Sequence, residues 1–209
     1  MKKLTLIVCV LFAMSAGTKV MAQATDEDYV VFNAHLLDVF EIVVYSGATQ
    51  TITFATAADY TNGVTEAGGI VPGFSDVSVE STGNWDMTIE CPDFVPGGGP
   101  NPGTGTIPVN NLGVWIESNG SFVFGNEVNC AYTAAASALG LTIAPTDLIT
   151  NNTGNAGDID ENDYRMHWLM GTMQGSMNGT SMFDQMQAPG GFTPGDYTTT
   201  ATLTITEIP

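Results

Sequence analysis

The sequence predicts an all-β, immunoglobulin-like sandwich. In residues 84–91, apolar side chains alternate strictly with polar ones, and residues 201–206 repeat this pattern with threonine at every even position. A period of two is typical of a strand with one buried face and one solvated face. Turns rich in glycine, proline and asparagine separate short apolar runs about every ten residues, a spacing that favours a β-sandwich.

The N-terminus has the pattern of a secretory signal peptide. Lys2 and Lys3 precede a mostly apolar run at 4–16, which is too short to be a membrane span, and Val20-Met21-Ala22 offers a cleavage site. We therefore expect residues 1–22 to be removed. The mature chain, 23–209, is expected to be exported and to form a single domain.

The mature chain is strongly acidic. Of its charged residues, only Arg165 is basic, against 22 acidic ones, so its formal net charge is −21. A chain with this charge will not bind nucleic acid or an anionic membrane through its own charges. Its self-repulsion must be relieved by salt or by bound cations.

The remaining elements follow in order along the chain. Strands are expected at 30–45, 49–55, 74–80, 84–91, 106–116 (opening as a turn), 122–124, 141–150, 164–170 and 197–206. The first two are predicted to pair as a hairpin, and residues 118–120 to form another hairpin turn. The alanine-rich segment 131–139 favours one short helix. Residues 57–73 and 92–105 have the glycine and proline content of loops.

Two cysteines remain in the mature chain, Cys91 and Cys130. An even number of cysteines in an exported protein suggests a disulfide, which would close a loop of about 40 residues and stabilise the fold by about 3–4 kcal/mol. The alternative is a pair of buried free thiols. Neither cysteine has a histidine near it in the sequence, so no catalytic thiol is predicted.

Three motifs occur in a characteristic order. They are Ser81–Ile89, led by Trp85; Thr106–Leu112, which contains Ile107-Pro108; and the closing strand at 194–206. In these motifs the chain resembles the WxL-type and fimbrial-subunit-like β-sandwich domains of bacterial surfaces. The resemblance implies a sandwich on or outside the cell and brings no catalytic residues. Met87 stands where the name-giving motif has leucine, so peptidoglycan attachment is not carried over.

An acidic segment offers a candidate calcium loop. Asp158, Asp160 and Asn162 have the alternate spacing of oxygen ligands in such loops, followed by Asp163. The pattern departs from an EF-hand, because Asp163 replaces the required glycine and Leu169 replaces the bidentate glutamate. We predict a calcium-stabilised loop, with a solvated acidic turn as the alternative.

A methionine-rich segment suggests a second metal. Met166, Met170, Met173 and Met177 have helical spacing around His167, and thioethers with an imidazole can hold Cu(I). Methionine more often fills gaps in a core, which is the favoured interpretation here. No spacing singles out a nucleophile with its base or a carboxylate pair, and no phosphate-binding loop follows a strand. The sequence therefore predicts a protein that is not an enzyme.

The sequence favours a structural role in a bacterial surface fibre. Residues 28–44 are longer, more apolar and more β-branched than one hairpin strand requires. We expect residues 28–37 to add as a strand to the open edge of another copy. The side chains predicted to make this contact are Val30, Val31, Phe32, Leu36 and Leu37.

The alternative function is a binding module, either a calcium-stabilised adhesin or a carbohydrate-binding domain. In that case Trp115 or Trp168 would supply an exposed platform on which a sugar ring stacks. In the structural role, both tryptophans belong to the core or to subunit contacts.

Overall fold

The computed structural model describes residues 38–208. The predicted signal peptide at 1–22 and the predicted assembly residues lie outside this range; the latter are Val30, Val31, Phe32, Leu36 and Leu37. Within 38–208, every helix is too short or too polar to cross a membrane.

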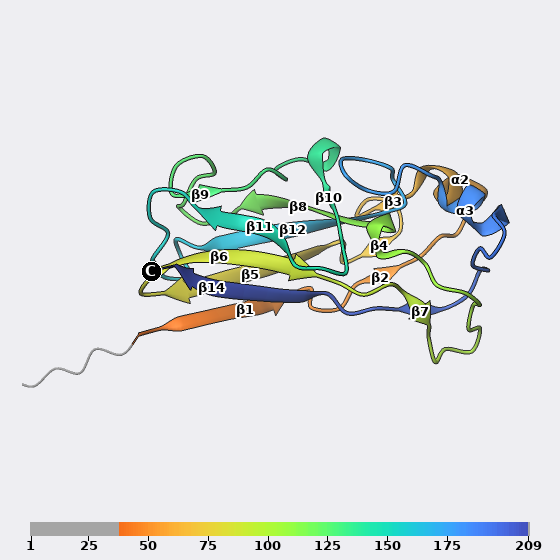
Figure 1. The fold of residues 1–209 in the computed structure, drawn as a ribbon, viewed down its shortest axis with the longest axis horizontal. Helices are drawn as coiled ribbons and strands as arrows, with labels where there is room; N and C mark the ends of the chain where they lie inside the picture. The colour runs from red at the N-terminus through yellow and green to blue at the C-terminus, as the bar shows by residue number, and fades with distance from the viewer. Residues whose placement is uncertain (1–37, 209) are drawn as a thin grey trace, which may run out of the picture. The chain divides into compact units, whose positions relative to one another are not determined.

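Two antiparallel sheets form the body of the fold, which confirms the predicted all-β sandwich (Figure 1). The first sheet contains, in spatial order, β1 (Phe40–Ser46), β5 (Phe74–Ser81), β12 (Asp163–Met170), β8 (Leu112–Ser118) and β10 (Leu139–Gly140), and β3 (Val64–Thr65) also pairs with β12. The second contains β14 (Thr202–Ile208), β6 (Asn84–Glu90), β11 (Thr146–Asn151) and β9 (Val128–Asn129).

Smaller elements flank the two sheets, most of them at one end (Figure 1). They are the two-stranded ribbons β2 (Thr51–Ile52) with β4 (Ile70–Val71) and β7 (Val95–Pro96) with β13 (Tyr197–Thr198), the helices α2 (Ala57–Asn62) and α3 (Met182–Gln187), and the 3-10 turns at Val109–Asn111 and Ala135–Ser137.

From β5 onward, the chain changes sheet at nearly every strand. β5, β8, β10 and β12 belong to the first sheet, and β6, β9, β11 and β14, which alternate with them along the chain, belong to the second. The predicted hairpin between 30–45 and 49–55 is therefore wrong, because β1 pairs with β5 and β2 pairs with β4. The turn at 118–120 also opens no hairpin, since its backbone amides donate to the carbonyl of Asp163.

The core lies between the inner faces of the two sheets. Trp85, Met87 and Ile89 alternate along β6 and are at most 1% exposed, as the sequence pattern predicted. Trp85 meets Tyr164 of the first sheet edge-on, with 6.2 Å between the ring centroids. Full burial of a large apolar side chain contributes about 1.5–3 kcal/mol, so this layer dominates the stability of the fold.

A buried polar network holds one end of the sandwich together. Asn155 accepts from the backbone amide of Trp85, donates to its carbonyl, and receives the indole N–H on its own carbonyl, at 2.9, 2.8 and 2.9 Å. Asn162 donates to the same Asn155 carbonyl and accepts from the Tyr164 hydroxyl. Because each buried polar group here has a partner, the network avoids the cost of unpaired burial.

The helices do not lie where the sequence analysis expected one. The predicted helix at 131–139 contains only a 3-10 turn, and its last residue belongs to β10. α2 begins instead inside a predicted loop, where Thr56 and Asp59 form a reciprocal capping box, and α3 begins at Ser181, whose hydroxyl accepts from the amide of Asp184. These local caps satisfy the first free amides of each helix, and 131–139 has no such cap.

The predicted disulfide is absent, since Cys91 and Cys130 are both free thiols. Cys91 directly follows β6 and Cys130 directly follows β9, and β11 lies between these strands, so two strand spacings, about 10 Å, separate the cysteines across the sheet. They also lie toward opposite ends of β11, because Ile89 pairs with Thr146 and Asn129 pairs with Thr150. A disulfide requires Cα atoms within about 7 Å, which this register does not allow.

Candidate functional site

On one side of the sandwich, each sheet ends in a strand that is hydrogen-bonded along only one of its two edges. β1 hydrogen-bonds to β5 and β14 hydrogen-bonds to β6, and among residues 38–208 neither has a partner on its other edge. β1 and β14 also contact each other, so both free edges lie on the same side of the sandwich (Figure 1). Free N–H and C=O groups on such edges are ready to pair with a further strand.

A groove of about 480 Å³ lies near the end of β1 and the start of β14 and reaches the core, with Val44 and Leu203 in its lining. Ile89, Met166, Trp168 and Met170 from the inner faces of β6 and β12 contribute to its lining. One rim comes from Val44 of β1 and from residues 47–50 after this strand, and the other from residues 193–195, 197–201 and Leu203 near the start of β14. The groove therefore exposes part of the apolar interior beside the end of β1 and the start of β14.

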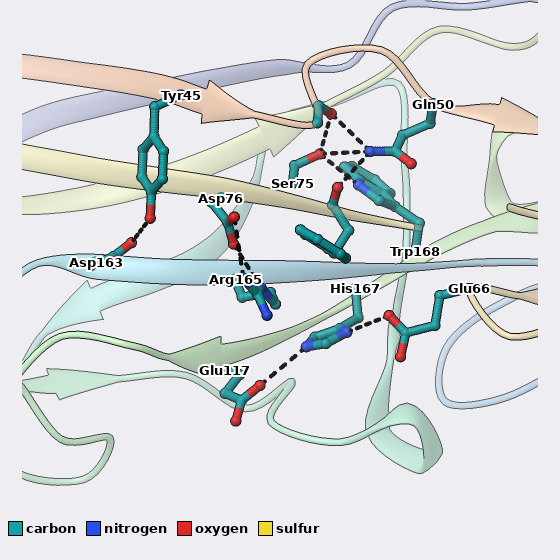
Figure 2. A network of polar contacts seen from close by, with 12 residues as sticks. Tyr45, Gln50, Glu66, Ser75, Asp76, Glu117, Asp163, Arg165, His167 and Trp168 are labelled. Atoms are coloured by element: carbon teal, nitrogen blue, oxygen red, sulfur yellow. Dashed lines mark hydrogen bonds and ion pairs between the residues drawn. The ribbon is translucent and has the colours of Figure 1, made fainter. Parts of the chain in front are cut away.

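Gln50 fixes the first rim (Figure 2). Its Nε2 donates to the carbonyl oxygens of Gly47 at 2.8 Å and Phe74 at 2.7 Å, and its Oε1 accepts from the amide of Gly73 at 2.9 Å. Gly47 has a φ of 63°, and a Cβ there would lie 2.1 Å from the Phe74 carbonyl oxygen, so this approach requires glycine. One side chain thus ties the loop after β1 to the start of β5.

Ser75 extends this clamp to the floor of the groove. Its hydroxyl donates to the Gly47 carbonyl at 2.7 Å and accepts the indole N–H of Trp168 at 2.9 Å (Figure 2). Trp168 is only 8% exposed, which leaves no face for a stacked sugar. The ring is held in place before any ligand arrives, so this part of the groove is preorganised.

The outer face of the first sheet carries a separate polar cluster. The His167 ring stacks on Trp115 with 3.8 Å between centroids and 5° between planes. Its Nδ1 lies 2.8 Å from a carboxylate oxygen of Glu66, and its Nε2 lies 3.3 Å from one of Glu117 (Figure 2). One face of Trp115 is therefore covered by histidine, and the ring is only partly exposed.

Arg165 lies beside this cluster on the same strand. Its guanidinium makes two hydrogen bonds to Asp76, at 2.7 and 3.2 Å, and lies 4.2 Å from the centre of the Phe74 ring. The hydrogen bond that Arg165 donates to Asp76 raises the pKa of Arg165 above its ordinary value. The one basic residue predicted for the mature chain is thus held by a buried carboxylate and contributes little to the surface field.

The predicted calcium ligands point in different directions. The amide of Asn162 is buried in the Asn155 network, and the carboxylate of Asp163 accepts the hydroxyl of Tyr45 at 2.6 Å. Asp158 and Asp160 share an exposed turn, in which the Asp158 side chain accepts the Asp160 amide. Among residues 38–208, no three acidic, histidine or cysteine side chains gather as a metal site.

Burial, the larger cause, and the hydrogen bond to Asp163 both raise the pKa of Tyr45. Its phenol therefore stays protonated and donates the hydrogen bond to Asp163.

The methionines and His167 are likewise not brought together. Met166 and Met170 project into the groove, whereas His167, between them on β12, points to the opposite face of the sheet. Met177 packs with Leu169 on that outer side. The alternating geometry of a strand separates the residues that helical spacing would have gathered.

Neither the protein-family models nor the curated proteins compared with this chain match it. The resemblance to WxL-type and fimbrial-subunit-like domains thus stays a prediction. The sequence analysis missed the groove, because its lining comes from segments scattered between Val44 and Leu203. In the sequence, Gly47 had only the pattern of a turn, and Gln50 that of a residue in the expected strand at 49–55.

Proposed function

We propose that this protein is an exported structural subunit of a bacterial cell-surface fibre, which joins copies of itself by strand addition. The observation that supports this proposal is the pair of unpaired edges, β1 and β14, on one side of the sandwich. A strand added at such an edge gains main-chain hydrogen bonds, and its alternate side chains set the register.

The exposed side chains of β1 also support an added partner. The large apolar residues exposed on or beside it are Val39, Phe40, Val43, Val44 and Tyr45, which are 37–52% exposed. Natural edge strands are usually protected by lysine, proline or short length, and the seven residues of β1 contain neither lysine nor proline. A subunit that hides this edge in an assembly has no need of such protection.

The charge sets a condition on assembly. With one basic residue against 22 acidic ones, copies of the mature chain repel each other unless ions screen them. We expect assembly to require moderate salt or a divalent cation. Calcium bound at the exposed turn of Asp158 and Asp160 stays part of this proposal, with fewer protein ligands than the sequence analysis expected.

The test is electron microscopy combined with light scattering on residues 23–209. The two salt conditions are about 0.01 M, where charges act over roughly 30 Å, and about 0.15 M, where they act over roughly 8 Å. Each is measured with calcium and with chelator. Filaments at the higher ionic strength are expected. Monodisperse particles in every condition would reject the fibre function.

The adhesin or carbohydrate-binding alternative rests on Trp115 alone, because Trp168 is buried. Trp115 is partly exposed and lies near the carboxylates of Glu66 and Glu117, which can accept sugar hydroxyls. If this alternative holds, tryptophan fluorescence changes on adding sugar and Trp115→Ala abolishes the change. In the fibre function, the fluorescence changes on assembly and is insensitive to sugar.

A further inference from the structure

We propose that the outer face of the first sheet docks a basic segment of a different protein, whose arginine or lysine side chains lie against its aromatic rings and its carboxylates. The inference goes beyond the proposed function and does not depend on it. A strand added at the edge of β1 lies in the plane of the sheet, so this face stays open in a fibre.

The outer face carries exposed apolar and aromatic surface. Because alternate side chains of a strand point to opposite sides, those between the core-facing positions of β1, β5, β12 and β8 point outward. On this side, Val43 is 38% exposed and Tyr45 is 52% exposed. Phe74 and Trp115 are partly exposed. Aromatic residues are enriched at protein interfaces, so the face has the composition of a contact surface.

Two glutamates on this face repel each other. Glu41 of β1 and Glu80 of β5 are directly opposite in the antiparallel register, and both are exposed. Like charges in such a pair destabilise a sheet. Among residues 38–208, Arg165 is the one arginine or lysine, and it is held by Asp76. A basic side chain of a partner, placed between the two glutamates, would relieve the repulsion.

Elsewhere on the face, carboxylates lie beside the aromatic rings. The hydroxyl of Tyr45 donates to Asp163 at 2.6 Å, which also fixes the direction of the ring (Figure 2). Glu117 follows two residues after Trp115 on β8, so both point to the same side, and the Glu117 side chain is 56% exposed. An arginine side chain can lie on a ring of this kind and pair with the carboxylate next to it.

Arg165 already shows this mode of binding within the molecule. Its guanidinium lies 4.2 Å from the centre of the Phe74 ring and makes two hydrogen bonds to Asp76 (Figure 2). The planar guanidinium suits both contacts, since it stacks on aromatic rings and binds carboxylates with two parallel hydrogen bonds. The two other pairs of ring and carboxylate offer the same combination to a partner's side chain.

The charge of the chain excludes a second copy as this partner. Each mature chain carries one basic residue against 22 acidic ones, and that residue is already paired with Asp76. Two copies therefore have no lysine or unpaired arginine to offer each other. A basic protein, in contrast, is attracted over a long distance by the net charge and then meets complementary carboxylates on the face.

The test is calorimetry on the full mature chain with a short peptide of alternating arginine and serine. The salt concentration is about 0.01 M, at which charges act over roughly 30 Å and the proposed fibre stays dissociated. The face variant is Glu80→Gln/Glu117→Gln. Asp158→Asn/Asp160→Asn is its matched control, because it removes the same charge from an exposed turn.

We expect the peptide to bind the wild type and to bind the face variant at least about tenfold more weakly, because two charge-assisted hydrogen bonds are lost. The control variant should change the affinity by less than about threefold, since its charges act only at a distance. Tyr45→Thr should weaken binding by about threefold, whereas Tyr45→Phe, which keeps the ring, should leave it nearly unchanged.

Two outcomes would overturn the proposal. Equal weakening by the face and control variants would show that binding follows the total charge and that this face is not a docking site. Spermine is the small polycation used for comparison. If it binds as tightly as the peptide and Tyr45→Thr affects neither, the face takes polyamines and a protein partner is rejected. Circular dichroism verifies that each variant is folded. Because binding is measured on dissociated chains, the result is independent of filament formation.

Discussion

Trp85 and Asn155, 70 residues apart in the sequence, exchange three hydrogen bonds inside the sandwich. Asn155 is fully buried and receives a fourth bond from Asn162. This pairing joins β6 to the segment that leads into β12, and so connects the two sheets at one end.

Asn155→Ala should therefore destabilise the fold by about 2–4 kcal/mol, because it leaves the Trp85 backbone amide and carbonyl buried without partners. Urea unfolding measures the change. Asn129→Ala, at an exposed position of β9, is the control and should change stability by less than about 0.5 kcal/mol. Equal effects for the two variants would contradict a structural role for this network.

The Gln50 clamp predicts a local effect on the groove. Gln50→Ala removes the hydrogen bonds that tie Gly47, Phe74 and Gly73 together and should cost about 1–3 kcal/mol. Hydrogen exchange should accelerate at residues 47–50 while β11, in the other sheet, keeps its protection. Uniform acceleration in both sheets would show that the clamp supports the whole fold and not this rim in particular.

The ion pair between Arg165 and Asp76 predicts an asymmetric response to mutation. Arg165→Met leaves the buried carboxylate of Asp76 without its donor and should cost about 3 kcal/mol, whereas Arg165→Met with Asp76→Asn should restore part of the loss. Because Arg165 is about one third exposed, screening reduces both values. A double-mutant cycle at low and high salt measures the coupling, and additive effects would contradict it.

The finding that Cys91 and Cys130 are free thiols can be tested by counting thiol groups. After purification in air and unfolding in denaturant, the mature chain should release two titratable thiols per molecule, against none for a disulfide. In the folded protein, burial raises the pKa of Cys130 to about 11. Alkylation at pH 8 should therefore be far slower than that of an exposed thiol, whose ordinary pKa is 9.0.

The same shift gives a dependence of stability on pH. Folding favours the neutral thiol of Cys130, so its contribution is complete below the ordinary pKa of 9.0 and is lost as the pH rises toward about 11. Cys130→Ser should flatten this part of the stability profile. A profile unchanged by the substitution would assign the loss to other groups.

Features that depend on neighbouring residues could be predicted from the sequence, whereas features that depend on contacts between distant segments could not. The alternation at 84–91 predicted both the strand and its buried face, because that pattern depends on neighbours in the chain. The pairing of strands depends on packing between distant segments, so the expected hairpin after 30–45 was wrong. The cysteine pair failed for the same reason, since the register of β11 decides the distance between them.

The candidate site was even less accessible to prediction. Residues 28–44 were recognised as unusually apolar, but the groove is built by side chains such as Gln50, Trp168 and Leu203 from segments far apart in the sequence. At Met166 and Met170 the favoured interpretation, core side chains of a strand, is confirmed, whereas the helical spacing of the copper alternative does not occur, because the strand places His167 on the other face.

The alternation of strands between the two sheets has a consequence for how the chain acquires its structure. β12 lies at the centre of the first sheet, between β5 and β8, and β14 completes the second, yet both lie late in the sequence. A chain that emerges from its N-terminus cannot join β5 to β8 until residue 163 has arrived. Contacts of such long sequence separation slow folding. β1 can pair with β5 early in synthesis, but the first sheet is completed only when β12 arrives and the second only when β14 arrives, so both layers close late.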